Sequence, residues 1–424
     1  MLGRRWALPG AISAIAFALA PTPGRAQTPT ASGYEYPAEW EPHEAIWLGF
    51  RVRVVAYDGV IVPMLRALTR HVDVRLVVET DSLIPHGLGF LAEEGVDLDR
   101  VQVFLQDPTD VWFRDPGPVF LRGEGGLAVA DFLYSNYANV PPDSFSPKAI
   151  AHEKIDEDVA RRMGLPTVPS LVVMEGGSIE VNGRGTLIVS ELTRRRNPHL
   201  TRAEIEEDLK RTLGQRHVIW LGEGLAEDPH NVQRIVEDYY GVGTGGHTDE
   251  FVRFVNDSTV ALAWVDEAER DAHPIHAINY ARMTENLQIL SRSTDQDGRP
   301  LRILRVPLPD MQHEAFVLTE ERFPRYRKLD PTLAVGDTLQ WVAVASYLNY
   351  VVTNGVLLLP RYWREGMPES QREKDAAVGR LFETLFPDRE IVRIDPRALN
   401  DEGGGMHCVV QQQPRIDSRP RGTS

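Results

Sequence analysis

The stretch Gly403-Gly404-Gly405-Met406-His407-Cys408-Val409-Val410 sets three glycines and the chain's one cysteine immediately before a β-branched run. Glycine lets the backbone turn sharply or approach another group closely, and valine favours an extended strand. The pattern therefore predicts a tight turn that presents a reactive side chain at the start of a strand.

Four further segments share this design, in which a polar or glycine-marked turn offers a polar side chain and a β-like run follows. They are residues 114–120, 175–181, 245–252 and 346–352. Their spacing, from about 55 to about 100 residues, is too uneven for a regular solenoid. We therefore expect an α/β protein of repeated ββα-type modules arranged radially, each delivering one polar strand start to a central site.

The remaining patterns place helices between short strands. Period-3.6 patterns predict helices over 57–71, 205–213, 273–288 and 370–386, with a capping box at Thr201 to Glu204. β-Branched runs predict strands over 74–78, 101–105, 171–173, 186–189, 217–221, 259–264, 303–306 and 356–359. Since no Pro/Gly/Ser-rich linker follows Gly33, the pattern favours one large α/β unit.

The N-terminus has the features of an export signal. Arg4 and Arg5 precede a short apolar stretch over 6–20, and a small-residue cleavage pattern ends at Ala26. The apolar stretch is too short to span a membrane, so the mature protein is expected to be periplasmic or secreted, by the Sec or the twin-arginine route. One cysteine cannot form an internal disulfide, so the thiol should stay free.

The chain is acidic. Its formal charge is −15, and removal of residues 1–26, which hold three arginines and no acid, makes it −18. This balance argues against nucleic acid and, after signal cleavage, against membranes as partners, and it is compatible with a cationic substrate.

The polar strand starts supply the parts of a nucleophilic site. Cys408 is a candidate nucleophile, His247 a candidate acid/base, and Asp249 its candidate carboxylate partner. Asp115 and Glu175 add carboxylates beyond what a protease needs. Because carboxylates pair with the forked N–H donors of a guanidinium, this excess suits a guanidinium substrate. The positive charge of such a substrate would also lower the pKa of the attacking thiol.

Simpler interpretations apply to several of these residues. A free cysteine can be an inert buried residue, and a His-x-Asp pair can be a turn contact or metal ligands. His407 is expected to pack or hydrogen-bond away from Cys408, and Trp112 and Tyr347 are expected in the core. Plain surface charge is expected for residues 194–196, 156–158 and 266–267.

Six ordered motifs resemble the family of agmatine deiminases and Porphyromonas-type peptidylarginine deiminases. The resemblance runs from about Tyr36 to Pro414, nearly the whole mature chain. The motifs are Pro-Ala-Glu-Trp-Glu-Pro-His-Glu-Ala at 37–45, Trp-Phe-Arg-Asp-Pro-Gly-Pro at 112–118, Glu-Gly-Gly-Ser-Ile at 175–179, Gly-His-Thr-Asp at 246–249, Ser-Tyr-Leu-Asn at 346–349, and Gly-Gly-Gly-Met-His-Cys at 403–408 with Gln-Gln at 411–412.

The resemblance implies a pentein fold, a five-bladed α/β propeller of ββαβ modules with pseudo-fivefold symmetry. Together with the export signal, it divides the chain into a signal peptide (1–26), a flexible mature N-terminus (27–35), one deiminase domain (36–414) and a tail (415–424). It implies hydrolysis of a guanidine through a covalent amidino-cysteine intermediate, no metal and no organic cofactor, and a homo-oligomer.

Site roles carry over by motif. Cys408 matches the nucleophile, His247 the general acid/base, and Asp115 and Asp249 the carboxylates that hold the guanidinium. Asn349, Trp112 and Glu175 are assigned to substrate binding. Glu175 is also a candidate for orienting the residues that contact the substrate.

The substrate remains open between agmatine, peptidylarginine and free arginine. The agmatine branch often carries an acid shortly before the histidine motif, whereas residues 241–246 hold none. This departure and the export signal favour an arginine-type substrate, whereas the sequences of the motifs themselves are more similar to those of the agmatine branch. Two other classes remain: a metal hydrolase using Cys408, His247 and Asp249, and a catalytically silent guanidine-binding protein.

Overall fold

Five β-sheets of the protein repeat one plan. The computed structural model describes residues 33–50, 55–80, 84–321 and 323–416. In each of these sheets a first strand runs antiparallel to a second, and the second runs parallel to a third. At least one helix connects the second strand to the third, as a parallel crossover requires.

The strands of the five sheets follow chain order, except that the last strand of the chain completes the first sheet. The sheets are β21 (Val410–Pro414), β2 (His43–Gly49), β3 (Asp73–Val78) and β4 (Val101–Leu105); β1 (Tyr34–Glu35), β5 (Val119–Gly123), β6 (Gly126–Leu133) and β7 (Thr167–Val173); β8 (Glu180–Val181), β9 (Thr186–Ser190) and β10 (His217–Leu221); β13 (Val252–Asn256), β14 (Thr259–Trp264) and β15 (Arg302–Pro307); and β18 (Val351–Thr353), β19 (Val356–Pro360) and β20 (Glu390–Ile394).

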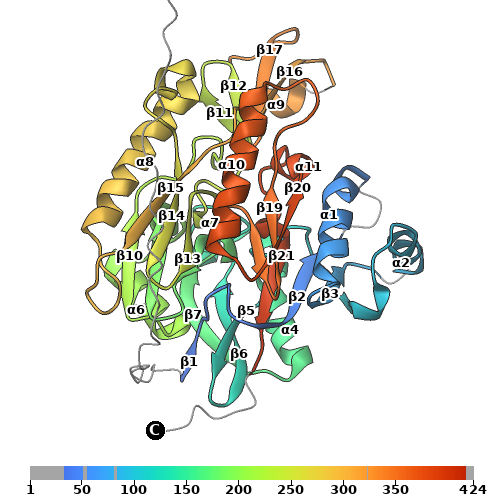
Figure 1. The fold of residues 1–424 in the computed structure, drawn as a ribbon, viewed down its shortest axis with the longest axis vertical. Helices are drawn as coiled ribbons and strands as arrows, with labels where there is room; N and C mark the ends of the chain where they lie inside the picture. The colour runs from blue at the N-terminus through green and yellow to red at the C-terminus, as the bar shows by residue number, and fades with distance from the viewer. Residues whose placement is uncertain (1–32, 51–54, 81–83, 322, 417–424) are drawn as a thin grey trace, which may run out of the picture.

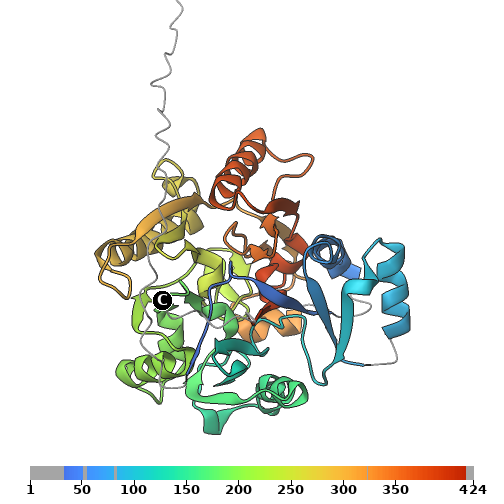
Figure 2. The same cartoon turned by 60° about the horizontal axis from the view of Figure 1, so that its bottom comes forward.

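The crossover helices lie on the outside of the molecule and the strands nearer its middle (Figure 2). The crossover helices are α1 (Val55–Leu68), α3 (Pro147–Glu153), α4 (Ile155–Met163), α5 (Glu191–Arg196), α6 (Arg202–Leu213), α8 (Pro274–Arg292) and α10 (Glu369–Leu385). The shorter or peripheral helices are α2 (Ile84–Glu93), α7 (Thr248–Phe251), α9 (Phe323–Leu329) and α11 (Arg397–Asn400).

A further sheet stands apart, at the upper end of the view in Figure 1. It orders β11 (Gln233–Val236), β12 (Tyr239–Gly241), β17 (Thr338–Val342) and β16 (His313–Val317), with α9 beside it. Its strands come from the connection before β13 and from the connection between β15 and β18, so it is formed by insertions between the repeated units.

The middle strands are apolar because both of their faces are covered. Every residue of β9, β14 and β19 is buried, which is typical of strands that pair in parallel under crossover helices. Their side chains join apolar clusters that extend under α8 and α10 and include Leu262, Leu357 and Phe382. The predicted strands and helices are confirmed to within a few residues, including the Thr201–Glu204 capping box and the left-handed Gly214 that ends α6.

The five polar turns found in the sequence each precede the first strand of one repeated sheet, namely β5, β8, β13, β18 and β21. The predicted association of glycine-marked turns with strand starts is therefore confirmed.

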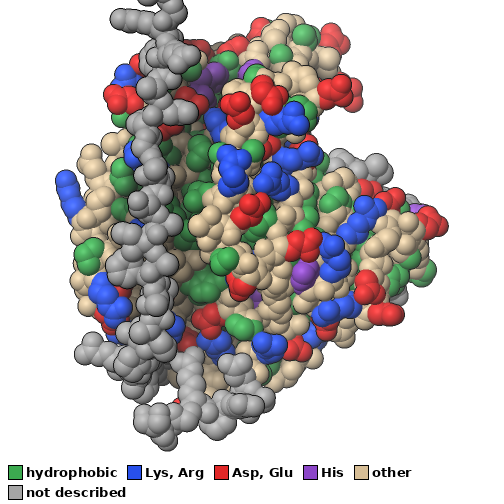
Figure 3. All heavy atoms as spheres, in the orientation of Figure 1, with side chains coloured by type: hydrophobic (Ala, Val, Ile, Leu, Met, Phe, Trp, Pro, Cys, Tyr) green, Lys and Arg blue, Asp and Glu red, His purple; other side chains and the backbone are tan. Residues whose placement is uncertain are grey.

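The surface and the termini add few constraints. On the face shown in Figure 3, basic and acidic side chains are interspersed. None of the helices in the described ranges combines the length and apolar character needed to cross a bilayer. The predicted export signal and most of the predicted C-terminal tail lie outside the described residues.

Candidate active site

Cys408 lies in a short 3-10 turn, His407–Val409, directly before β21. The three preceding glycines act differently. Gly403 adopts a left-handed φ of 94°, Gly404 lies against the ring of Trp112, and Gly405 lies against the amide of Asn349. A side chain at either of the last two would collide with these neighbours, so the glycines are needed for close approach more than for positive φ.

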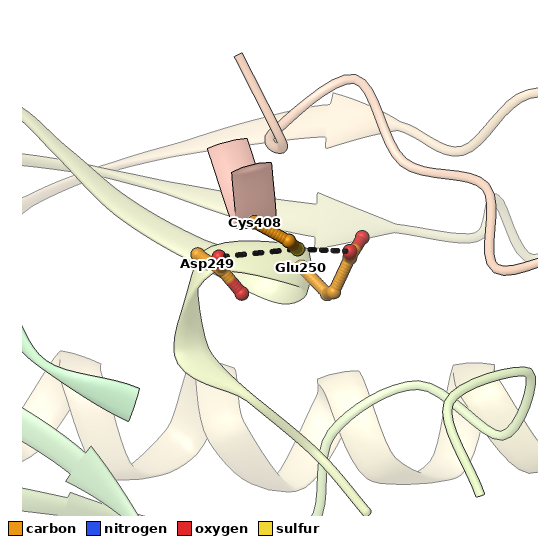
Figure 4. Close-up of side chains that lie close together, drawn as sticks. All are labelled: Asp249, Glu250 and Cys408. Carbon is orange, nitrogen blue, oxygen red and sulfur yellow. Dashed lines mark hydrogen bonds between the residues drawn. The ribbon is translucent and has the colours of Figure 1, made fainter. Parts of the chain in front are cut away.

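The thiol is 4% exposed and has four polar neighbours. The backbone N–H of Gly405 and the side-chain amide of Asn349 donate to Sγ at 3.3 and 3.4 Å. Asp249 Oδ2 and Glu250 Oε1 lie 3.7 and 3.8 Å from Sγ, one on each side (Figure 4). Two consecutive residues of α7 thus flank the only cysteine.

The second part of the site consists of His247, Asp115 and Glu175. His247 Nδ1 lies 3.7 Å from Asp115 Oδ1, and Nε2 lies 3.6 Å from Glu175 Oε2. The two parts meet at Gly177. A Cβ there would lie 2.5 Å from His247 Nδ1, 3.1 Å from Asp115 Oδ1 and 3.2 Å from Asp249 Oδ2. One glycine therefore keeps open the space that these three side chains share.

Each of these acids is oriented by another group. Tyr137 donates its hydroxyl to Asp115 Oδ2 at 2.8 Å, and the N–H of Gly177 donates to Oδ1 at 3.0 Å. Arg196 forms a buried ion pair with Glu175 at 2.7 Å. Such contacts restrict the carboxylates to one rotamer each.

A buried carboxylate holds the loop that leads to His247. Asp228 accepts the backbone N–H groups of residues 244–247 at 2.5–3.3 Å. Its carboxylate also occupies the space that a side chain at Gly243 would need. The loop that lacks an acid in its own sequence is therefore organised by an acid from an earlier segment.

An ion network surrounds His407. Its Nδ1 lies 2.7 Å from Asp249 Oδ2, and its Nε2 lies 2.8 Å from Glu39 Oε1. Glu39 also pairs with Arg114 and Arg253, and Arg253 pairs with Glu180. Contacts at both ring nitrogens hold the ring in one orientation, and the contact at Nδ1 fixes the carboxylate of Asp249.

Burial and charge set the protonation of the thiol and its flanking acids. Burial, reinforced by Asp249, Glu250 and Asp115, raises the pKa of the Cys408 thiol well above its usual value. Burial and then Asp249 likewise raise the pKa of Glu250. Burial opposes ionisation of Asp249, but the hydrogen bond and charge of His407 outweigh it and lower its pKa. These surroundings thus favour the protonated thiol over the thiolate.

His247 has the opposite tendency. Burial opposes its charge, but Asp115 and Glu175 outweigh that effect and raise its pKa to about 9. Burial raises the pKa of Asp115 to about 6, whereas Arg196 and His247 overcome burial and lower that of Glu175 to about 2. At neutral pH the histidine is therefore an imidazolium and able to donate a proton.

Several buried polar atoms of the site have no hydrogen-bond partner among the described residues. They are Asp249 Oδ1, Glu250 Oε2, Glu175 Oε2 and both ring nitrogens of His247. Buried polar atoms without partners are costly and rare in folded proteins. Their concentration beside one thiol marks a place for a polar ligand.

A metal ion fits this place poorly. Asp249, Glu250 and Cys408 present ligand-type atoms within 4.8 Å of one another. However, Asp249 Oδ2 is held by His407 and Glu250 Oε1 by Asn349. A metal ion prefers carboxylate oxygens that are free to coordinate it, so we do not assign these residues as metal ligands.

The predicted site residues occupy one region. Cys408, Asn349 and Asp249 lie together, and Asp249 meets His247 and Asp115 around Gly177. Glu175 lies beside His247, and Trp112 packs against the glycine turn. The prediction that His407 hydrogen-bonds elsewhere agrees with the structure, although the reason is a 3-10 turn and not the alternation of a strand.

Sequence reasoning missed some residues and misplaced others. Glu250 was not singled out, although it follows Asp249 directly. The arginine run 194–196 was predicted to be surface charge, which is wrong for Arg196, since it is fully buried against Glu175. The same prediction is wrong for Asp156, which is buried at the start of α4.

The fold and the site define an α/β protein with one cysteine at an acid-lined centre, and comparisons with known proteins give its family. The family model described as Porphyromonas-type peptidyl-arginine deiminase matches residues 35–414. The chain therefore belongs to this family, and it is a deiminase, a hydrolase that acts on guanidino groups.

Individual relatives agree in length as well as in sequence. Agmatine deiminase of Medicago truncatula is 30% identical over 410 residues, covering 92% of this chain and 98% of the relative. Agmatine deiminase of Stutzerimonas stutzeri is 29% identical, covering 91% and 97%. The solved agmatine deiminase of Enterococcus faecalis shares the fold, with a TM-score of 0.69, 22% identity and coverage of 92% and 98%.

Proposed function

We propose that the protein deiminates a small alkylguanidine, with agmatine as the preferred substrate, giving N-carbamoylputrescine and ammonia. The observation that carries this proposal is the set of unpartnered carboxylate oxygens beside the buried Cys408 thiol. A guanidinium presents several N–H donors in one plane, which match carboxylate acceptors.

The charges of the site support a substrate that activates its own nucleophile. In the empty site the thiol is protonated because it is buried beside three acids. A guanidinium held by Asp115 and Asp249 brings positive charge to the thiol and lowers its pKa, since an opposite charge within about 4–6 Å favours ionisation. The reactive thiolate is then formed where its target is bound.

The proposed reaction has two halves. Cys408 Sγ, as thiolate, forms a bond to the guanidinium carbon, and His247 donates its proton to a departing amino group, which leaves as ammonia. Water then adds to the amidino-cysteine intermediate, with neutral His247 taking a proton from the water. The C–S bond breaks, which releases the ureido product and restores the thiol. Asp115 and Asp249 orient the cation throughout.

The burial of the site favours a small substrate over a protein chain. Cys408, Asp249, His247 and Asn349 are each at most 4% exposed. A slender alkylguanidine reaches such a centre more readily than a folded protein surface does. The curated relatives reported above are agmatine deiminases, which supports the same choice. The family name supports peptidylarginine as the second candidate.

One experiment decides among the substrates. The mature protein is incubated separately with agmatine, free arginine and an arginine-containing peptide, and ammonia and ureido product are measured. We expect release from agmatine at a rate at least tenfold above the others, and none from the Cys408→Ala variant. Faster release from the peptide would favour the second candidate, and release by the alanine variant would contradict the cysteine mechanism.

We also propose that the five repeated sheets form a five-bladed propeller around the site. The shared strand order and the position of a polar turn before each first strand support this arrangement. An experimental structure with blades unrelated by a common rotation would refute it.

The export of the protein, and its assembly into a homo-oligomer, are further proposals. The basic, apolar and small-residue segments over 1–26 support export. N-terminal sequencing of protein from the periplasm or medium should begin at Gln27, and retention of full-length protein in the cytoplasm would refute export. Light scattering after size exclusion should give a mass above that of one mature chain.

A further inference from the structure

We propose that Glu250 is a third carboxylate that binds the guanidinium, alongside Asp115 and Asp249. This inference rests on the proposed function and extends it to a residue that the family motifs did not point to. The thiol of Cys408 is flanked by two consecutive acids, of which only Asp249 matched a motif role.

The position of Glu250 suits this task. It is 2% exposed, its Oε1 lies 3.8 Å from Sγ, and Asn349 Nδ2 donates to the same oxygen at 2.8 Å. One oxygen is thereby fixed, and the other, Oε2, is buried without a partner. Asn349 thus orients the carboxyl group without consuming its second acceptor.

The geometry of attack brings the substrate to this carboxyl group. A carbon poised for attack lies roughly 3–3.5 Å from the nucleophile. Since Asp249 and Glu250 lie 3.7 and 3.8 Å from the same sulfur, nitrogens bonded to that carbon fall within reach of both acids. Two acids that flank one thiol can therefore contact different N–H groups of one cation.

Charge complementarity points the same way. Glu250 faces Asp249, Asp228 and Glu227 and has no basic side chain among its partners in the described part of the chain. Its neighbour Asp249 already has a partner in His407, whose Nδ1 lies 2.7 Å from Oδ2. A bound guanidinium would supply the positive charge that Glu250 lacks, whereas the ureido product, neutral at that group, would not. Glu250 should thus favour substrate over product.

The test measures binding without turnover, in the Cys408→Ala background, with agmatine and N-carbamoylputrescine as ligands. These two ligands carry the same amine end and differ at the reacting end. Adding Glu250→Gln should weaken agmatine binding by about 10- to 100-fold, as loss of a charged hydrogen-bond partner does, and weaken the ureido ligand by less than about threefold. Isothermal calorimetry measures both affinities.

Two further variants control for structure. Asp156 is also a buried acid, but it accepts from the backbone N–H of Glu157 at the start of α4 and is not among the contacts of the thiol or of Glu250. Adding Asp156→Asn should change neither affinity by more than about threefold, and adding Glu250→Asp should retain much of the preference for agmatine. Thermal melting confirms that each variant folds.

The outcomes separate the two proposals. If Glu250→Gln binds agmatine within threefold of its parent, or weakens both ligands equally, Glu250 does not bind the guanidinium, and the proposed function stands. If the unaltered protein releases no ammonia from any guanidine and the Cys408→Ala protein binds none, the proposed function fails and the role of Glu250 fails with it.

Discussion

Gly177 gives the sharpest test of the site's geometry. In Gly177→Ala the new methyl carbon would lie 2.5 Å from His247 Nδ1, about 1 Å closer than ordinary contact allows. It would also press on Asp115 and Asp249 at 3.1 and 3.2 Å. The φ of Gly177 is not in the left-handed region, so the backbone accepts alanine and the collision falls on the side chains.

The expected effect is large on catalysis and modest on stability. His247 or its acids must move by on the order of 1 Å, and misplacement of that size costs roughly 100-fold in rate. Overpacking should lower the free energy of unfolding by about 1–3 kcal/mol. Ammonia release gives kcat and KM, and chemical denaturation gives stability.

A matched glycine provides the control. Gly89 lies exposed in α2 with nothing near the place of a Cβ, so Gly89→Ala should keep full activity and be slightly stabilising, by about 0.5–1 kcal/mol. If Gly177→Ala retains kcat/KM within threefold of the unaltered enzyme, the space around Gly177 is not the reaction centre.

Four other predictions follow from the charges of the site. Glu175→Gln removes a charge that raises the pKa of His247, so the alkaline limb of the pH–rate profile should move to lower pH by on the order of one unit. An unmoved limb would mean that Glu175 does not set the pKa of the catalytic acid. Because His247 has a pKa of about 9 when folded and 6.5 ordinarily, its contribution to stability is full below pH 6.5 and is lost as pH rises through 9. The free energy of unfolding, measured by denaturation, should therefore fall by about 3 kcal/mol as the pH rises, and it should fall less in His247→Gln. The same pH dependence in both proteins would contradict this assignment. Arg253→Met removes the ion-pair partner of Glu180 and one of the partners of Glu39 in the interior and should cost about 3–5 kcal/mol of stability, whereas a melting temperature unchanged from the unaltered protein would mean that the network is solvated. Incubation with EDTA should leave ammonia release unchanged, and a loss restored by zinc would favour the metal hydrolase.

Local sequence patterns predicted the repeated units well. Each unit combines a glycine-marked or polar turn with a β-branched run, and both signals arise within a few residues. Strands such as β14 and β19 are buried throughout and almost entirely apolar because they are covered on both faces, so they also stand out locally. A single sequence therefore predicts the elements that are determined by residues close together in the chain.

Partners distant in sequence were harder to predict. Arg196 belongs to a run of three arginines, and nothing within that run indicates that the third turns inward to Glu175, 21 positions earlier. Glu250 was missed for a different reason. Strand-like alternation would point it away from Asp249, whereas the single helical turn of α7 lets both acids reach the thiol. The loop before His247 lacks an acid in its own sequence, but Asp228 supplies one in space.

The high pKa of the thiol gives the proposed site a chemical filter. Thiolates, not thiols, are the species that attack and that are readily oxidised, so a cysteine kept protonated by burial and by neighbouring acids stays unreactive while the site is empty. A guanidinium reverses this state because its charge favours the thiolate. A neutral amide or urea brings no such charge and leaves the thiol protonated. The same acids that keep Cys408 protonated in the absence of a cation therefore restrict its reactivity to guanidines. They also slow the reverse reaction, because the ureido product is neutral at the reacting group.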